Sequence, residues 1–309
     1  MFLSILEMVL PVVTMFLLGY LMNRKKLLTE AGHQGLKSVV SNITLPVVLF
    51  NAFFTAEYNG RILLTFGVVY VSCGLGLALG FLLRRFVRPY DKFMPFLVTN
   101  FEGGMLGYAL FGLLYPGRTG VFAMADIGQT LAAYSIFLVT LTTVSSGRSD
   151  PKGIAKSALT NRALIGAFLG VLLGALGLGK TILSSPVGGV ISSLISFISA
   201  PTSALILLIV GYELSFRREL MGPVLKTVGL RLVITALLCV LGSLIIFSVL
   251  PFEKELLVAL LLAWSLPAPF IIPLYADVTG HGNYISATLS MQTILSIFLF
   301  IAVSVYTLA

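Results

Sequence analysis

The sequence predicts an all-α membrane protein with ten transmembrane helices, and three observations lead to this prediction. The first is composition: 58% of the 309 residues are hydrophobic and 10% are charged, too few to cover a water-soluble globule of this size. The second is a succession of apolar runs about 20 residues long, the length that one bilayer crossing requires. The third is an alternation of basic charge between the connections that join these runs.

The apolar runs place the spans in order along the chain. We expect the ten spans near residues 3–22, 37–56, 62–83, 93–115, 121–145, 159–177, 188–213, 224–250, 255–277 and 284–308. The basic segment NRKK follows the first run instead of preceding it, so we expect that run to stay in the membrane and not to be cleaved as a signal peptide.

The charges orient the spans, because short cytoplasmic loops retain Lys and Arg. The odd-numbered connections, at 23–36, 84–92, 146–158, 214–223 and the ninth, hold or adjoin fifteen Lys and Arg residues, whereas the even-numbered connections hold four. We therefore expect the odd connections in the cytoplasm and both chain termini outside the cell membrane. The net charge of +8 follows mostly from this topology, so we expect no nucleic-acid partner.

Short matches between the two halves of the chain indicate an internal repeat. Prolines in spans two and seven, C-x-x-G segments in spans three and eight, and Gln-Thr pairs in spans five and ten recur at offsets of 155, 166 and 163 residues: Pro46 and Pro201, Cys73 and Cys239, Gln129 and Gln292. We expect a first repeat over 1–147, a cytoplasmic linker over 148–158 and a second repeat over 159–309. Five spans per repeat place the second repeat upside down relative to the first, as in many secondary transporters.

Spans four and nine, which correspond in this repeat, both contain helix-breaking residues. Span nine reads LLAWSLPAPFIIPLYADV, and its prolines remove backbone donors and clash with the preceding turn. Span four reads TNFEGGMLGY at its middle, where three glycines lower helix propensity. Unwound backbone inside a membrane is tolerated only where protein buries it or it lines a cavity. Two crossing breaks would therefore form a binding site whose half-helix N-termini favour an anion.

These features resemble the auxin efflux carrier family of bacteria and plants, which includes the PIN-FORMED carriers and bacterial malate or malonate permeases. The resemblance rests on the ten-span plan, the element from Asn100 through Gly103 to Gly107, the proline-broken span nine and the segment DIGQT in span five. It implies an elevator-type carrier fold with a scaffold of spans one, two, six and seven. The mobile transport unit would be spans three to five and eight to ten. Ala109, where relatives often have proline, and Glu102 depart from the family pattern.

The candidate substrate-binding residues are polar or helix-breaking residues of the crossover and the spans expected around it. They are Asn51, Asn100, Glu102, Gly103, Gly104, Asp126, Gln129, Pro267, Pro269 and Gln292. A carboxylate near a bilayer centre is costly, so Glu102 has either a functional role or a structural hydrogen bond to loosened backbone. Asp126 and Gln129, one helical turn apart, either bind the substrate directly or hold the crossover, unless Asp126 simply lies near the outer interface. We expect Arg231 to extend its side chain to the cytoplasmic surface, as Lys226 one turn away would.

The sequence favours a secondary transporter that moves a small organic anion, a carboxylate or auxin-like molecule, through the lipid bilayer. Two alternatives stay open: a receptor that keeps the carrier fold without transport, and a carrier of a cationic or zwitterionic solute selected by Glu102. An enzyme is disfavoured, because the chain has neither a nucleophile–base pair nor metal-ligand spacing. We expect no bound cofactor or metal, leave coupling to protons or sodium open, and consider a homodimer compatible with the sequence.

The charge asymmetry yields a test of the topology. In a background lacking Cys73 and Cys239, single cysteines placed at Ser149 and at Lys180 should react with a membrane-impermeant maleimide from opposite sides. Labelling of both positions from outside would contradict the inverted arrangement of the two halves.

Overall fold

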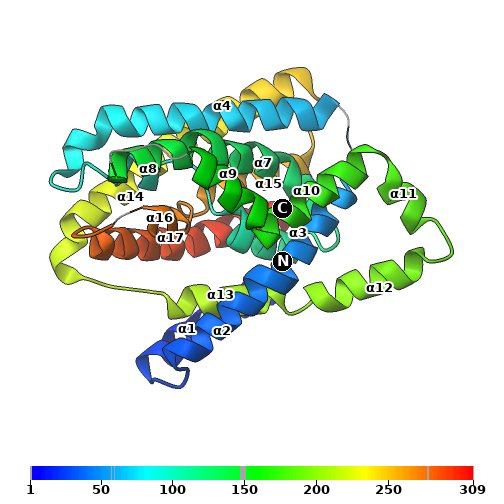
Figure 1. The fold of residues 1–309 in the computed structure, drawn as a ribbon, viewed down its shortest axis with the longest axis horizontal. Coiled ribbons are helices and arrows are strands. Elements are labelled where there is room, and N and C mark those ends of the chain that lie inside the picture. Colours follow the sequence, from blue (N-terminus) through cyan, green and yellow to red (C-terminus); the bar gives the residue numbers. More distant parts are fainter. Residues whose placement is uncertain (1, 57, 59, 147–150, 277, 309) are drawn as a thin grey trace.

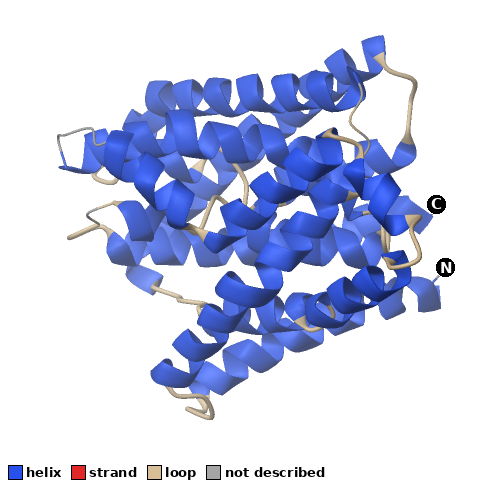
Figure 2. Cartoon of the chain, turned by 45° about the vertical axis from the view of Figure 1, so that its right-hand side comes forward, coloured by secondary structure: helices blue, strands red, loops and turns tan. Residues whose placement is uncertain are grey.

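The fold is a bundle of helices, several of which are interrupted near their middle (Figure 1). A computed structural model describes residues 2–56, 58, 60–146, 151–276 and 278–308, and over these residues it contains helices, turns and loops but no strand (Figure 2). Ser149, one of the two proposed labelling positions, lies outside the described residues.

The helices follow the predicted order of spans. Spans one to five comprise α1 (Phe2–Arg24), α2 (Glu30–Val39) with η1 (Val40–Thr44) and α3 (Leu45–Phe54), α4 (Gly60–Leu83) with η2 (Arg84–Val87), α5 (Met94–Leu97) with η3 (Gly103–Gly107) and α6 (Tyr108–Leu114), and α7 (Thr119–Ala132) with η4 (Ala133–Phe137) and α8 (Leu138–Ser146). After α9 (Pro151–Thr160), spans six to ten comprise α10 (Arg162–Ala175) with α11 (Leu178–Leu183), α12 (Gly188–Ser199) with α13 (Thr202–Tyr212), η5 (Arg218–Leu220) with α14 (Met221–Val249), α15 (Lys254–Ser265) with α16 (Ile272–Tyr275), and α17 (Gly282–Leu308).

Six helical stretches of the described chain are long and apolar enough to cross a membrane. They are Glu30–Phe54, Gly60–Val87, Thr119–Ser146, Gly188–Tyr212, Arg218–Val249 and Gly282–Leu308. These stretches coincide with predicted spans two, three, five, seven, eight and ten, so the chain is a multi-pass membrane protein. Predicted spans four, six and nine correspond to shorter apolar helices or to helices that break, and predicted span one corresponds to α1, of which Val9–Arg24 is an apolar helix.

Close backbone contacts join α1 to α13 and α3 to α10, and glycines make both contacts. A Cβ at Gly19 of α1 would lie 2.0 Å from the carbonyl oxygen of Leu208. In the other pair, a Cβ at Gly174 of α10 would lie 2.5 Å from the carbonyl oxygen of Phe53. Because a real Cβ does not approach a carbonyl so closely, only glycine lets these backbones meet, as in other membrane helix pairs.

The remaining helices surround the two interrupted ones. α4 packs along α7, α14 packs against both α4 and α15, and α15 lies between α7 and α17. The large apolar side chains with the least exposure gather here, among them Phe96, Phe101 and Phe122. The core of the molecule therefore sits around the breaks of spans four and nine.

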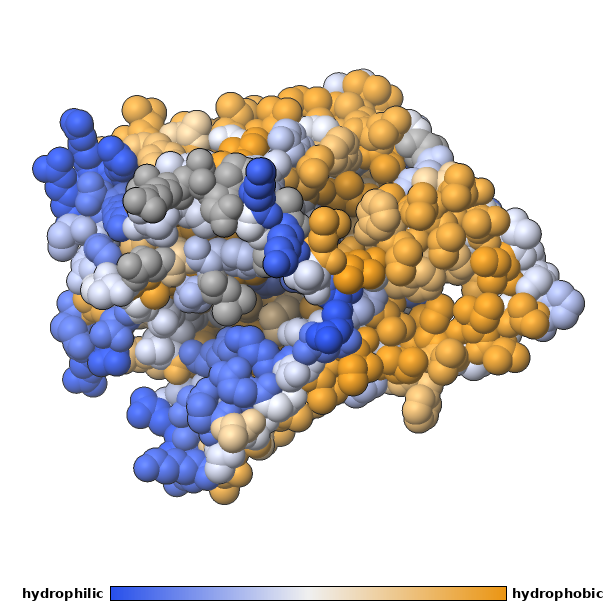
Figure 3. All heavy atoms as spheres, in the orientation of Figure 1, coloured by the Kyte–Doolittle hydropathy of each residue, from blue (hydrophilic) through white to orange (hydrophobic). Residues whose placement is uncertain are grey.

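Contacts between connections join odd with odd and even with even. Lys37 binds Glu213 at 2.6 Å and so links the first and seventh connections, and Arg217 donates to Asn283 of the ninth at 3.3 Å. At the even connections, Arg61 and Arg118 pair with the two acidic residues at the start of α15, Glu253 and Glu255. The Arg61 guanidinium donates to the Glu253 carboxylate and holds the pKa of Glu253 below its ordinary value. In Figure 3 the hydrophilic residues gather at the end that carries the odd connections, and apolar side chains cover much of the rest of that view.

The glycine contact between α1 and α13 can be tested by adding one methyl group. Gly19→Ala places a Cβ against the backbone of Leu208, and we expect a lower melting temperature of the purified protein. Gly67→Ala in α4 is the matched control, because nothing lies within 4 Å of its added Cβ. That control should gain about 0.5 to 1 kcal/mol from the better helix former. Equal melting temperatures for the two variants would contradict the close contact.

Candidate functional site

The break in span four consists of the residues between α5 and η3. α5 ends at Leu97, and residues 98–102 are not helical and are all buried. Asn100 has a backbone φ of +52°, a left-handed conformation that asparagine adopts more readily than most residues. Thr99 fixes this segment to α4, because its hydroxyl donates to the carbonyl of Cys73 at 3.0 Å. The first part of the quoted segment, residues 99–102, is thus unwound and buried, and helical backbone resumes at Gly103.

The break in span nine consists of the residues between α15 and α16. α15 ends at Ser265, and the helix resumes at Ile272 with Pro273 in its first turn. Pro267 and Pro269 lie between them and have no N–H to donate, so the helical ladder cannot continue through this segment. The first turn of the resumed helix is tied to Pro269, whose carbonyl accepts from Ile272 at 3.4 Å.

Glu102 joins the two breaks. Its backbone N–H donates to the carbonyl of Pro267 at 2.9 Å. Its carboxylate accepts the N–H of Met105 at 3.2 Å and the N–H of Phe270 at 2.7 Å. Met105 belongs to span four and Phe270 to span nine, so one carboxylate, 8% exposed, satisfies donors on both broken helices. These are donors at the half-helix N-termini that the sequence assigned to a substrate anion.

Arg231 also joins the two breaks, but it does so as a donor to backbone carbonyls. The expectation that its side chain reaches the cytoplasmic surface was therefore wrong. The residue lies on α14 and is 4% exposed. Its guanidinium donates to four backbone carbonyls: Leu97 at 3.4 Å, Thr99 at 3.1 Å, Asn100 at 2.7 Å and Leu266 at 2.7 Å. The snorkelling interpretation failed because it considered only the sequence neighbours of Arg231, whereas its partners lie at least 35 residues away. The available signal was a basic residue well inside an apolar span, beyond Lys226 at its edge, and such a residue by default marks a functional position.

The two glutamines of the repeat both bind unwound backbone. Gln129 on α7 donates to the carbonyl of Phe101 at 2.7 Å. Gln292 on α17 accepts from the N–H of Ala268 at 2.9 Å and donates to the carbonyl of Leu97 at 2.7 Å. Gln292 therefore bridges the breaks of spans nine and four, whereas Gln129 binds span four alone.

Asp126 lies against the break of span four. It is 2% exposed, and its Oδ1 has no hydrogen-bond partner among the described residues. A Cβ at Gly103 would lie 2.0 Å from that oxygen, so only glycine leaves room for the carboxylate. The hydroxyl of Tyr108, which the sequence analysis did not single out, lies beside Asp126. The structure thus places Asp126 in the buried centre and not near the outer interface.

Two candidate residues have weaker links to the crossover. Gly104 lies beside Glu102, and a Cβ built there would be 3.8 Å from the Glu102 carboxylate. Asn51 lies half-buried on α3, and the contacts of the described residues do not join its side chain to either break. Nine of the ten candidates, Gly104 among them, therefore lie around the two breaks. Asn51 lies on the neighbouring helix α3.

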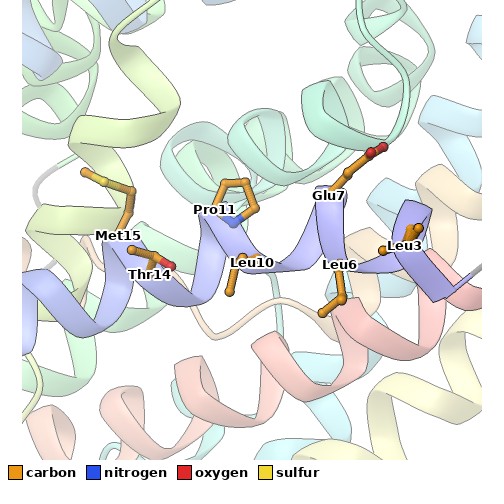
Figure 4. A pocket seen from close by; sticks show the side chains of 7 residues that line it. All are labelled: Leu3, Leu6, Glu7, Leu10, Pro11, Thr14 and Met15. Carbon is orange, nitrogen blue, oxygen red and sulfur yellow. The ribbon is translucent and has the colours of Figure 1, made fainter.

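The cavity found beside the crossover residues Arg231 and Gln292 is too small for an organic solute. Its volume is about 10 Å³, which is at the lower limit for one water molecule. A larger pocket of about 520 Å³ is lined only by α1, where apolar side chains such as Leu6 and Leu10 are exposed and Glu7 points away from them (Figure 4). Among the described residues, no group of three or more His, Cys, Asp and Glu is placed to hold a metal ion.

Comparison with known proteins identifies the class of this molecule. Residues 4–146 match the sequence model of a family described as "Membrane transport protein". The chain is also similar over nearly its whole length to a protein of Methanothermobacter thermautotrophicus named "Uncharacterized transporter". The two are 26% identical over 306 residues, which cover 96% of each chain. Together with the fold, these matches confirm the resemblance to the auxin efflux carrier family of membrane transporters.

The bridging role of Gln292 can be separated from the role of Gln129. Gln292→Leu leaves the buried N–H of Ala268 without its partner, and an unsatisfied buried donor costs about 1 to 3 kcal/mol. Gln129→Leu leaves the Phe101 carbonyl with the N–H of Gly103, which donates to it at 3.0 Å. We therefore expect a larger fall in melting temperature for Gln292→Leu than for Gln129→Leu. The reverse order would contradict the bridging geometry.

Proposed function

We propose that the protein is a secondary transporter that moves a small organic anion by alternating access at the crossing breaks of spans four and nine. The proposal assigns ten crossings to two inverted repeats, 1–147 and 159–309, joined by the cytoplasmic linker 148–158, with both termini outside the cell membrane. The alternation of odd and even connections in the contacts described above supports this threading. The substrate and the coupling ion are parts of the proposal.

The inverted repeat is supported by a second pair of matched contacts. Gly19 and Gly174 are 155 residues apart, the same offset as Pro46 and Pro201. The carbonyls that they touch, of Leu208 and Phe53, are also 155 residues apart. Span one therefore touches span seven as span six touches span two, as a two-fold relation between the repeats requires.

The same contacts support a division into a scaffold and a transport unit. The interlocked pairs α1 with α13 and α3 with α10 comprise spans one, two, six and seven. The helices around the breaks comprise spans three to five and eight to ten. An elevator-type carrier would move the transport unit, spans three to five and eight to ten, against the scaffold. Glu102, Asp126 and both glutamines belong to the transport unit and would move with the solute.

One observation carries the proposal of an anionic substrate: the Glu102 carboxylate accepts N–H groups from both broken helices. This arrangement is a site for a carboxylate, filled by the protein's own side chain. A substrate carboxylate brought to the same donors would repel Glu102 strongly in a medium of low dielectric constant. Uptake of a proton by Glu102 removes the repulsion and frees the donors, so the anion and the proton would bind together and their binding would be linked.

A specific observation also favours the second candidate, a carrier of a cationic or zwitterionic solute. Glu102 and Asp126 place two buried carboxyl groups beside the same break, and Asp126 Oδ1 has no hydrogen-bond partner among the described residues. A solute ammonium group would bind these acids directly. The two candidates differ in the charge that Glu102 must have when the solute is bound.

The neutral variant Glu102→Gln separates these candidates. If an anion binds with a proton, the variant should bind the substrate as well as or better than the wild type, lose the pH dependence of binding between about pH 5 and about pH 8, and transport without accumulating the solute. If Glu102 binds a solute cation, the variant should lose binding. The measurement is substrate affinity across this pH range, with the substrate first found by a thermal-shift screen of mono- and dicarboxylates. An unchanged pH profile with unchanged affinity would contradict both roles of Glu102.

Counterflow in proteoliposomes distinguishes a carrier from a receptor with the carrier fold. A carrier should exchange labelled external solute for unlabelled internal solute, because the occupied site must face each side in turn. Binding of the solute without exchange would contradict the proposed transport.

A further inference from the structure

The unwound backbone of the crossover exposes carbonyl oxygens as well as N–H groups. Four of these oxygens converge on one point: those of Leu97, Thr99 and Asn100 from span four and that of Leu266 from span nine. Helix C-termini carry partial negative charge, and the carbonyls lie where α5 and α15 end. In membrane carriers built from broken helices, unwound carbonyls and half-helix C-terminal ends are the groups that coordinate a coupling sodium ion.

Here a side chain fills the centre of this carbonyl cluster. The guanidinium of Arg231 contacts all four oxygens, and its position on a long continuous helix, α14, fixes it from outside both breaks. The ion pairs described for the structure do not include Arg231, so the carbonyl dipoles are what compensates its charge among the described residues. The cavity beside it, about 10 Å³, leaves no room for an organic group.

Arginine differs from a dissociable ion in two respects. Its guanidinium stays protonated in proteins and presents five donors in a rigid plane, so it can bind several carbonyls at once. It is also covalently attached, and so its charge cannot leave the site at one side of the membrane and return from the other. A cation held in this way stabilises the crossover but cannot transmit the energy of an ion gradient.

We propose that Arg231 is a resident cation of the crossover: it occupies the place of a coupling sodium ion, positions both breaks, and makes the transport cycle independent of sodium at this place. The location of the cycle at the crossover rests on the proposed function. The inference that a cation occupies the carbonyl cluster does not rest on the proposed function. The experiment below therefore needs neither a substrate nor transport.

The experiment compares melting temperatures of purified protein in choline, sodium and guanidinium chloride at equal ionic strength. Wild type should melt at the same temperature in choline and in sodium. Arg231→Ala should melt lower, and guanidinium at about 10 mM should raise its melting temperature by several degrees, because a cation that binds only the folded state stabilises it by mass action. Lys226→Ala, an exposed position on the same helix, is the control and should respond to neither cation.

Three results would overturn the proposal. They are a specific stabilisation of the wild type by sodium, an Arg231→Ala variant as stable as the wild type, and an Arg231→Ala variant that guanidinium does not stabilise. If this variant cannot be purified, Arg231→Lys and Arg231→Met replace it, compared by the monodisperse fraction on size-exclusion chromatography. The cation hypothesis predicts more folded protein for Arg231→Lys than for the uncharged Arg231→Met, and equal fractions would mean that packing alone explains the residue.

Failure of this experiment and failure of the proposed function are distinguishable. The Glu102→Gln measurements report on the N–H groups of the breaks, and the Arg231 measurements report on the carbonyl groups. Loss of the cation response would leave an anion carrier possible with a dissociable ion, whereas a failed counterflow assay would leave the resident cation in place.

Discussion

Two buried charged side chains satisfy the backbone that two broken helices leave unpaired. Glu102 accepts N–H groups on both helices, and Arg231 donates to carbonyl groups on both. Without such partners each unsatisfied group would cost about 1 to 3 kcal/mol in a buried environment, and a membrane offers no water to replace them. The crossover is therefore held by a carboxylate on its N–H groups and a guanidinium on its carbonyl groups, together with Gln129 and Gln292. The packing of α4, α7, α14, α15 and α17 places these side chains where they are needed.

This arrangement also constrains function. A transporter must open its binding site to each side of the membrane in turn, and the proposed site has two features of known carrier sites: unwound backbone and discontinuous helices. Under the proposed function, a solute anion would compete with the Glu102 carboxylate for the N–H groups of Met105 and Phe270, whereas a solute cation would bind that carboxylate. Arg231 occupies the cation-binding part from a helix outside both breaks. In the proposed mechanism, the Glu102 side chain gives way to a solute anion when it is protonated, whereas Arg231 stays in place.

The breaks and several residues that bind them were predictable from the sequence, whereas the contacts of Arg231 were not. Pro267 and Pro269 interrupt a helix by local chemistry alone, and the repeat predicted that Gln129 and Gln292 belong to the same centre. Arg231 was misjudged, because its four carbonyl partners come from distant parts of the chain and no local pattern records which way the side chain turns. Asn51 was included for its position in span two, yet its helix packs mainly on α10, and the side-chain contacts of the described residues do not join Asn51 to either break. Local effects, such as a proline that interrupts a helix, can be predicted from neighbouring residues. Contacts between residues far apart in the sequence can be predicted only when the whole fold is known.

The central claim is that one carboxylate holds both broken helices, and hydrogen–deuterium exchange tests it most directly. Exchange should be measured for peptides covering residues 101–107 and 266–275 in the wild type and in Glu102→Gln. Because Glu102 accepts from Met105 and from Phe270, the variant should lose protection in both peptides together, while a peptide from the middle of α4 stays unchanged. Loss of protection in the first peptide alone, or in neither, would contradict the account.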